Sequence, residues 1–173
     1  KMKDLHATDD ASTPLAPDER KELIPTHIAL RSELNELEQK NILEADQWVF
    51  GRKRDVLDEG FLKRLHKRMF GKVWKWAGTY RKTERNVGVV PWQIQPKLKE
   101  TLDDVRFWIE NKTYAPDEIA VRFHHRLVSI HPFPNGNGRW SRLVADVLAV
   151  SLGQPRFAWG RGNLQNAGET RKR

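Results

Sequence analysis

Residues 131–142 read HPFPNGNGRWSR, and this short stretch separates two segments that have the apolar spacing of helices. Pro132 disfavours the helical conformation of the residue before it, so the preceding helix should end there. Asn135-Gly136 is a turn dipeptide, and the two glycines of the stretch permit unusual backbone angles and a close approach to a ligand. The stretch therefore predicts a loop that carries His131 at its mouth and opens a new helix near Arg139.

Two arginines, Arg139 and Arg142, lie in the first turn of that next helix. The free backbone N–H groups of a helix N-terminus attract anions, so two cations are unfavourable there unless an anion is bound. A spacing of three residues places both side chains on one face of the helix. The pattern indicates a polyphosphate site. The alternative, a glycine-rich helix start with solvent-facing arginines, explains the placement less well.

Helical spacing of apolar residues recurs on both sides of this loop. We expect one helix from Thr26, or two with a break near Asn41, and another over 59–70 that begins after Asp58. Residues 71–95 have no helical period and predict a loop or a small hairpin. Further helices are expected over 96–111, 116–130 and 139–152. The sequence therefore predicts an all-α fold with one short β element.

The chain of 173 residues carries 31 lysines and arginines against 23 acidic residues, a formal net charge of +8. Such a balance favours an anionic partner, such as a nucleotide or a nucleic acid, although lysines on solvated helix faces produce it too. No apolar run approaches the roughly 18 residues that predict a membrane span. The sequence has no cysteine, which fits a reducing compartment. We therefore expect a cytoplasmic protein without a membrane segment.

The loop stretch resembles the signature of the Fic family, HPFx(D/E)GNGRxxR, and departs from it only at Asn135, which stands at the acidic position. The segment WAGTYR at 76–81 also looks Fic-like. ELNELEQKNILEA at 33–45 and PRFAWG at 155–160 are similar to a bacterial subgroup called "mobile mystery protein B". The resemblance implies a Fic-type helical bundle with a short β-hairpin flap.

We expect three parts along the chain. Residues 1–25 contain several prolines and predict an extended arm, residues 26–160 form the Fic-like domain, and residues 161–173 form a tail. Within the domain, the helix at about 26–40 resembles an inhibitory helix of some family members, whose pattern is (S/T)xxxE(G/N). Ser32 and Glu36 match that pattern. By resemblance the glutamate pairs with Arg142 of the loop, whereas the alternative is an acidic helix that faces solvent.

The resemblance implies a protein adenylyltransferase, which moves AMP from ATP to a Ser, Thr or Tyr hydroxyl of a target protein or of the chain itself. His131 would be the general base that takes the hydroxyl proton, a role that suits a near-neutral pKa. Asn135 would stand at the Mg²⁺ position with a neutral amide only, so ATP would hold most of the metal. The residues implied in nucleotide binding are Phe133, Gly136, Asn137, Gly138, Arg139 and Arg142.

The segment 83–95 is implied to be a flap that aligns a target chain by strand pairing. Its central residues are Asn86, Val87, Gly88 and Val89, and an ordinary surface loop is the alternative. An oligomeric state is compatible with the sequence, and no nucleic acid is expected as a substrate.

A different class of function stays open. Lys/Arg clusters fit a basic module that binds nucleic acid or protein, with weak or no catalysis because of Asn135. They lie on several elements, however, and no helix-turn-helix or RNA-binding signature accompanies them. His124-His125 lacks partners at metal-ligand spacing, and His27 and His66 are interpreted as surface or cap residues. The clusters are at 52–54, 63–68, 81–85 and 171–173.

Overall fold

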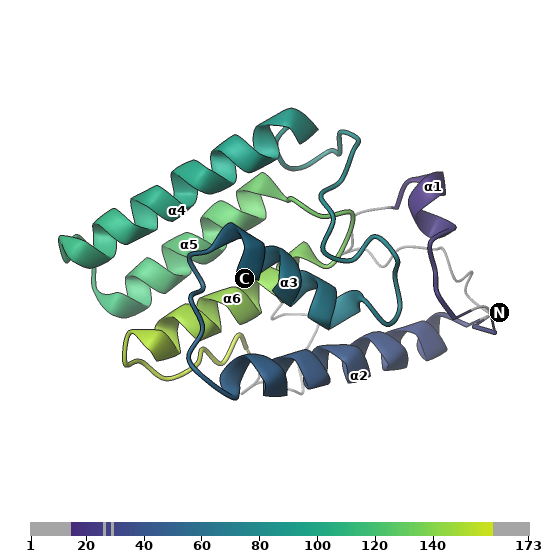
Figure 1. The fold of residues 1–173 in the computed structure, drawn as a ribbon, viewed down its shortest axis with the longest axis horizontal. Helices are drawn as coiled ribbons and strands as arrows, with labels where there is room; N and C mark the ends of the chain where they lie inside the picture. Colours follow the sequence, from purple (N-terminus) through teal and green to yellow (C-terminus); the bar gives the residue numbers. More distant parts are fainter. Residues whose placement is uncertain (1–14, 26, 29, 161–173) are drawn as a thin grey trace.

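The computed structural model describes residues 15–25, 27, 28 and 30–160, which form an all-α domain (Figure 1). The predicted fold class is confirmed. No helix among these residues is long and apolar enough to cross a membrane. The predicted tail over 161–173 and most of the predicted arm lie outside the described residues. The helices are α1 (Pro17–Arg20), α2 (Arg31–Phe50), α3 (Glu59–Phe70), the 3₁₀ helix η1 (Pro91–Gln93), α4 (Ile94–Glu110), α5 (Pro116–Ile130) and α6 (Asn137–Ser151).

The helix α6 is central to the core because it packs against α5, α3 and α2. Its inward side chains recur every four residues, as the helical period requires, at Trp140, Val144 and Leu148, and all three are buried. The indole Nε1 of Trp140 donates a hydrogen bond of 3.0 Å to the carbonyl oxygen of Leu62 in α3. Truncation of a buried aromatic side chain typically costs about 3–5 kcal/mol. The start of α6, which lies within the stretch 131–142, is therefore held firmly in place.

Local capping and packing explain how α2 and α3 are bounded. The carboxylate of Asp58 accepts the backbone N–H of Phe61 at 2.9 Å, which confirms the predicted start of α3. Of the two alternatives for this segment, one helix or two with a break near Asn41, the structure has the single helix α2. The amide of Asn41 donates to the carbonyl of Arg68 and accepts from the backbone N–H of Lys72. A polar residue in mid-helix thus fastens α2 to the end of α3.

The predicted β-hairpin is wrong, and the loop alternative is the one that the structure takes. Within the described ranges the only strand-like pairing is an isolated bridge between Leu23 and Trp74. That bridge belongs to the described part of the predicted arm, which also bonds to the domain through the Ile24 N–H and the Val73 carbonyl. Residues 15–25 therefore contain one helical turn and pack on the domain, because their backbone finds partners there.

Candidate active site

His131 lies directly after the last residue of α5, where Pro132 was expected to end the helix. Its backbone is left-handed, with φ 53° and ψ 63°, and its N–H still donates to the carbonyl of Leu127 at 3.0 Å. Such a conformation costs a non-glycine residue roughly 1–2 kcal/mol. The surrounding contacts must therefore hold the imidazole at the mouth of the loop.

The glycine and asparagine side of the loop is shaped by contacts within the protein. Gly136 caps α6 with φ 79°, and a Cβ atom there would lie 2.5 Å from the ring of Phe70. A glycine is thus required at this position because the Phe70 ring lies so close to it. The sequence had instead predicted that a ligand approaches the glycine. The amide of Asn137, 3 % exposed, accepts from the N–H of Phe133 and donates to its carbonyl, both at 2.9 Å. The Asn137 side chain therefore closes the loop on itself.

Phe133 anchors the loop from below. Its side chain is fully buried and stacks on the imidazole of His66 with ring centroids 3.7 Å apart. The indole of Trp140 packs edge-on against the Phe133 ring, with ring centroids 4.9 Å apart. The side chains of Phe133 and Asn137 therefore support the loop, and no side chain caps the backbone N–H groups at the start of α6. Such uncapped groups at a helix N-terminus attract anions.

His66 is a buried support of the loop, so its interpretation as a surface or cap residue was wrong. Its Nδ1 accepts from the backbone N–H of Gly78 at 2.9 Å, which leaves the proton on Nε2. The Nε2 group then donates to the carbonyl of Asn135 at 3.0 Å. Burial lowers the pKa of His66 to about 3, and the charge of Arg139 acts in the same direction. The four-residue spacing from Leu62 to His66 could have indicated this inward position.

We expect the free energy of unfolding to decrease as the pH is lowered below about 6.5. Burial lowers the pKa of His66 to about 3, and those of His124 and His131 to about 4, whereas the ordinary value is 6.5. Below pH 6.5 the unfolded chain therefore binds protons at these histidines, whereas the folded chain does not. The free energy of unfolding then decreases by up to about 1.4 kcal/mol per pH unit for each group. Urea unfolding at about pH 7.5 and about pH 5 measures this loss.

The matched variant for this experiment is His66→Gln, whose amide can accept from Gly78 and donate to Asn135 without titrating. Its stability should fall less steeply between the same two pH values than that of the unmodified protein. Equal slopes in both proteins would contradict the assignment of His66 as a neutral buried group.

Arg81 connects the segment 83–90 to His131. Its side chain is buried, 2 % exposed, and donates to four carbonyl oxygens. The Nε group reaches the carbonyl of His131 at 2.5 Å, and its own backbone N–H donates to Pro132 at 2.9 Å. The other three acceptors are the carbonyls of Thr83, Val89 and Ile130. A single guanidinium thus fixes both the left-handed turn at His131 and the segment that crosses beside it.

The predicted flap residues lie next to His131 without forming a strand. Asn86, Val87 and Gly88 are exposed, and the N–H of Val89 donates to the carbonyl of Ile130 at 3.2 Å. A Cβ atom on Gly88 would lie 2.6 Å from the Cβ atom of His131. The segment therefore passes directly over the edge of the loop, and its use for target docking stays a prediction.

Arg81 should also control the protonation of His131. The pKa of His131 is lowered to about 4. Burial is the largest cause, and the positive charges of Arg81 and Arg85 act in the same direction. We expect Arg81→Met to raise that pKa towards its ordinary value, because one nearby cation is lost. Arg81→Lys keeps the charge and should hold the pKa low. NMR titration of the His131 ring measures both, with Lys82→Met as a control at an exposed neighbour. An unchanged pKa in Arg81→Met would contradict this electrostatic role.

Arg139 is held by a glutamate of α2. Its Nη1 atom lies 3.0 Å from Oε2 of Glu38, whose side chain is only 9 % exposed. Its Nη2 atom donates to the side-chain oxygen of Asn135 at 3.4 Å, and its guanidinium lies over the ring of Phe70 at 4.8 Å. One of the two arginines of the loop is therefore paired with a carboxylate of α2.

The predicted inhibitory residues lie elsewhere on α2. Ser32 and Glu36 are exposed, and Glu38 takes the place at the loop that was expected for Glu36. Two residues separated by two positions on an α-helix point about 200° apart, so only one of them can face α6. The carboxylate also pairs with Arg139, where Arg142 was expected. The predicted pairing therefore differs from the structure, while an inhibitory role of the helix stays a prediction.

Residues 56–149, more than half of the chain, match the Fic/DOC family. The chain belongs to the Fic/DOC family. It is 30% identical over 115 residues to "Protein adenylyltransferase fic-1" of Caenorhabditis elegans, which covers 62% of this chain and 22% of that protein. It is also 30% identical over 107 residues to "Protein adenylyltransferase Fic" of Aedes aegypti, which covers 60% and 21%. The chain thus spans about a fifth of the length of these curated relatives.

Solved Fic domains share the fold. An N-terminal Fic domain of a putative cell filamentation protein from Bartonella quintana superposes with a TM-score of 0.66 at 18% identity, covering 89% of each chain. The BepC protein of Bartonella tribocorum with bound AMPPNP gives 0.62 at 20% identity, covering 80% of each chain. At these identities the likeness establishes the fold. The narrower similarity to the "mobile mystery protein B" subgroup stays a prediction.

The Fic loop of this chain, residues 131–142, does not fit a protein-held Mg²⁺. Asn135 offers a neutral amide whose oxygen already accepts from Arg139, and its backbone carbonyl accepts from His66. In the part of the chain that the structure describes, no group of three or more His, Cys, Asp or Glu side chains could hold a metal ion. Mg²⁺ prefers carboxylate and phosphate oxygens, so the loop supplies no anionic ligand for it.

Proposed function

We propose that this chain is a protein adenylyltransferase domain that moves AMP from ATP to a Ser, Thr or Tyr hydroxyl of a protein. The observation that carries the proposal is the position of His131 at the mouth of the Fic loop, which opens α6 with Arg139 and Arg142 in its first turns. The names of the curated relatives, "Protein adenylyltransferase", support the activity. A neighbouring structure with bound AMPPNP supports ATP as the donor.

The transfer uses the loop and helix as follows. The triphosphate binds across the N-terminus of α6, where backbone N–H groups favour the charge that develops on the α-phosphate. The acceptor hydroxyl oxygen forms a bond to the α-phosphorus, and the bond from that phosphorus to the bridging oxygen breaks. Arg139 and Arg142 bind the outer phosphates, which leave as pyrophosphate. His131 takes the proton of the acceptor hydroxyl.

The protonation state of His131 suits this role. Its pKa of about 4 in the ligand-free protein leaves the imidazole neutral at pH 7, which is the form that accepts a proton. Such a low pKa also makes it a weaker base than the near-neutral value expected from the sequence. A bound triphosphate brings negative charge close to the ring and so raises its pKa towards neutrality. The base therefore becomes stronger when the substrate is present.

The proposal extends to the acceptor, the metal and the location of the protein. The segment 83–90 passes beside His131 and is placed to align a target chain, or a second copy of this chain, by backbone contacts. Mg²⁺ would arrive bound to the phosphates of ATP, because the loop itself lacks a carboxylate. A cytoplasmic location, where ATP and protein targets are abundant, fits the absence of cysteine from the sequence.

The α2 helix restrains this activity through Glu38. Its carboxylate lies where the outer phosphates would bind and satisfies Arg139 in their absence. A γ-phosphate has to displace it before Arg139 can hold the triphosphate, so ATP binds in a poor pose for attack at the α-phosphorus. The pair thereby keeps the ligand-free state stable and the transfer slow.

Calorimetric titration of ATP and AMP into Arg139→Ala tests the nucleotide site directly. The variant should lose about 10- to 100-fold in ATP affinity, the equivalent of one charge-assisted hydrogen bond, and much less in AMP affinity. Only the outer phosphates of ATP are expected to touch Arg139. Arg122→Ala is the matched control, since that arginine pairs with Glu118 on the exposed face of α5. Equal losses for ATP and AMP would place Arg139 away from the outer phosphates.

A further inference from the structure

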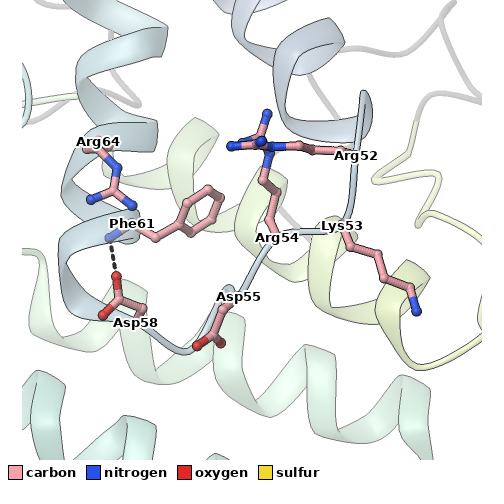
Figure 2. Close-up of a pocket in the computed structure, with 7 residues that line it drawn as sticks. All are labelled: Arg52, Lys53, Arg54, Asp55, Asp58, Phe61 and Arg64. Carbon is pink, nitrogen blue, oxygen red and sulfur yellow. Dashed lines mark hydrogen bonds between the residues drawn. The ribbon is translucent and has the colours of Figure 1, made fainter.

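A second basic site lies where α2 ends and α3 begins. Its pocket has a volume of about 370 Å³, within the range of small-molecule sites. Figure 2 shows its lining, which consists of four basic side chains, two aspartates and Phe61. None of these residues belongs to the Fic loop. The four basic residues are Arg52, Lys53, Arg54 and Arg64, and we call this the arginine pocket.

The positive charge of the arginine pocket is not neutralised by its own carboxylates. Asp55 accepts the backbone N–H of Leu57 at 3.0 Å, and Asp58 accepts that of Phe61 at 2.9 Å. Both aspartates therefore cap the backbone. Within residues 30–160 neither forms an ion pair with an arginine of the pocket, and the nearby Arg68 on α3 has no carboxylate partner there either. Like charges this close repel one another, and a bound anion would relieve that repulsion.

Trp48 fixes the guanidinium of Arg54 in the pocket and that of Arg68, which lies nearby outside the lining. Arg54 lies over its ring at 4.0 Å and Arg68 at 4.5 Å, both in cation–π contact. Because their planes are held in this way, little side-chain freedom remains to be lost when a ligand binds. Figure 2 shows the Arg52 and Arg54 side chains converging while Lys53 points away. Of the pocket's arginines, Arg54 is thus arranged before any ligand arrives.

Arg54 is incompletely satisfied within the protein. Its Nη2 group donates to the carbonyl of Trp48 at 2.9 Å, while its Nε atom is buried with no hydrogen-bond partner among the described residues. Burial lowers the pKa of Arg54, and the charges of three neighbouring arginines, Arg52, Arg68 and Arg64, act in the same direction. A guanidinium that is partly desolvated and surrounded by like charges gains from an added oxyanion.

We propose that the arginine pocket binds the phosphate group of a small phosphorylated molecule, at a site separate from the Fic loop. Guanidinium groups match a phosphate because their planar forks offer two parallel N–H donors. A single-stranded nucleic acid is less well matched, because proteins hold such strands partly through aromatic rings that stack on the bases. The ring of Trp48 is instead covered by Arg54 and Arg68. The occupant is therefore a compact phosphate.

The test follows the Nε–H NMR signals of Arg54 and Arg64 during titration with inorganic phosphate and, separately, with ribose 5-phosphate. Sodium chloride at matched ionic strength is the control. We expect saturable shifts with a Kd of about 1 mM or lower for at least one phosphate compound. A larger effect of the ester identifies a phosphorylated metabolite, and an equal effect identifies the free anion. Shifts that do not saturate, or that chloride reproduces, overturn the proposal.

Variants localise the site. Arg64→Gln removes one exposed guanidinium and should weaken phosphate binding about tenfold, whereas Lys97→Gln, with the same charge change on exposed α4, should not. An unchanged Kd in Arg64→Gln contradicts the assignment, as does a single-stranded oligonucleotide that shifts these signals when phosphate does not. The Arg139 signal reports ATP binding at the Fic loop in the same spectra, so failure of one site is distinguished from failure of the other.

Discussion

His131→Ala is expected to lower adenylyl transfer by on the order of 10²- to 10⁴-fold, the usual loss when a general base is removed. The backbone N–H of residue 131 still donates to Leu127, and Arg81 still binds its carbonyl, because both contacts use main-chain atoms. Fold and ATP affinity should therefore change little. Single-turnover transfer with α-labelled ATP measures the rate, and calorimetry measures the affinity.

The matched control for this variant is His125→Ala, which removes an exposed imidazole on α5 and should leave the rate unchanged. A His131→Ala protein that transfers AMP as fast as the unmodified protein would show that the proton leaves by another route. A variant that also loses ATP binding would show that the imidazole holds the nucleotide.

Glu38→Gln should raise the rate of transfer at subsaturating ATP by about 10- to 100-fold. The carboxylate pairs with Arg139 at 3.0 Å and is almost fully buried, so a hydrogen bond to a charged group, worth about 1.5–3 kcal/mol, is weakened. Glutamine keeps the volume of the side chain, which avoids a cavity. Arg139 then becomes available to the outer phosphates without first breaking an ion pair.

Two comparisons make this prediction specific. Glu36→Gln removes the same charge from the exposed face of α2 and should leave the rate unchanged. Arg139→Ala also breaks the pair but removes the phosphate ligand, so it should not reproduce the gain. If Glu38→Gln shows no increase, or if Glu36→Gln shows the same increase, α2 does not restrain the loop through Glu38.

The parts that could be predicted from the sequence are those set by local chemistry. Pro132 ends α5 through a steric clash with the preceding residue, and Asp58 begins α3 through a side-chain cap, so both boundaries were predictable. The loop between α5 and α6 was predictable for the same reason. The order of its residues also carries the family signature, which the match over 56–149 confirms.

The parts that could not be predicted depend on contacts between distant segments. His66 supports Asn135 from 69 positions away, and no local pattern states that a histidine lies beneath the loop. Glu38 and Glu36 have the same chemistry, and only the rotation of α2 against α6 decides which one meets Arg139. The segment 83–90 has β-prone residues but is fixed by the side chain of Arg81, which replaces strand pairing.

The most direct test of the proposed transfer is the identity of the products that the Glu38→Gln protein forms from ATP. Attack at the α-phosphorus predicts pyrophosphate, with AMP found on the protein or released by water, and His131→Ala should lower the formation of both by on the order of 10²- to 10⁴-fold. ATP labelled at the α-phosphorus should leave label on protein, and ATP labelled at the γ-phosphorus should not. The formation of ADP and phosphate, a protein-bound γ-label, or no turnover of ATP would contradict adenylyl transfer by this loop.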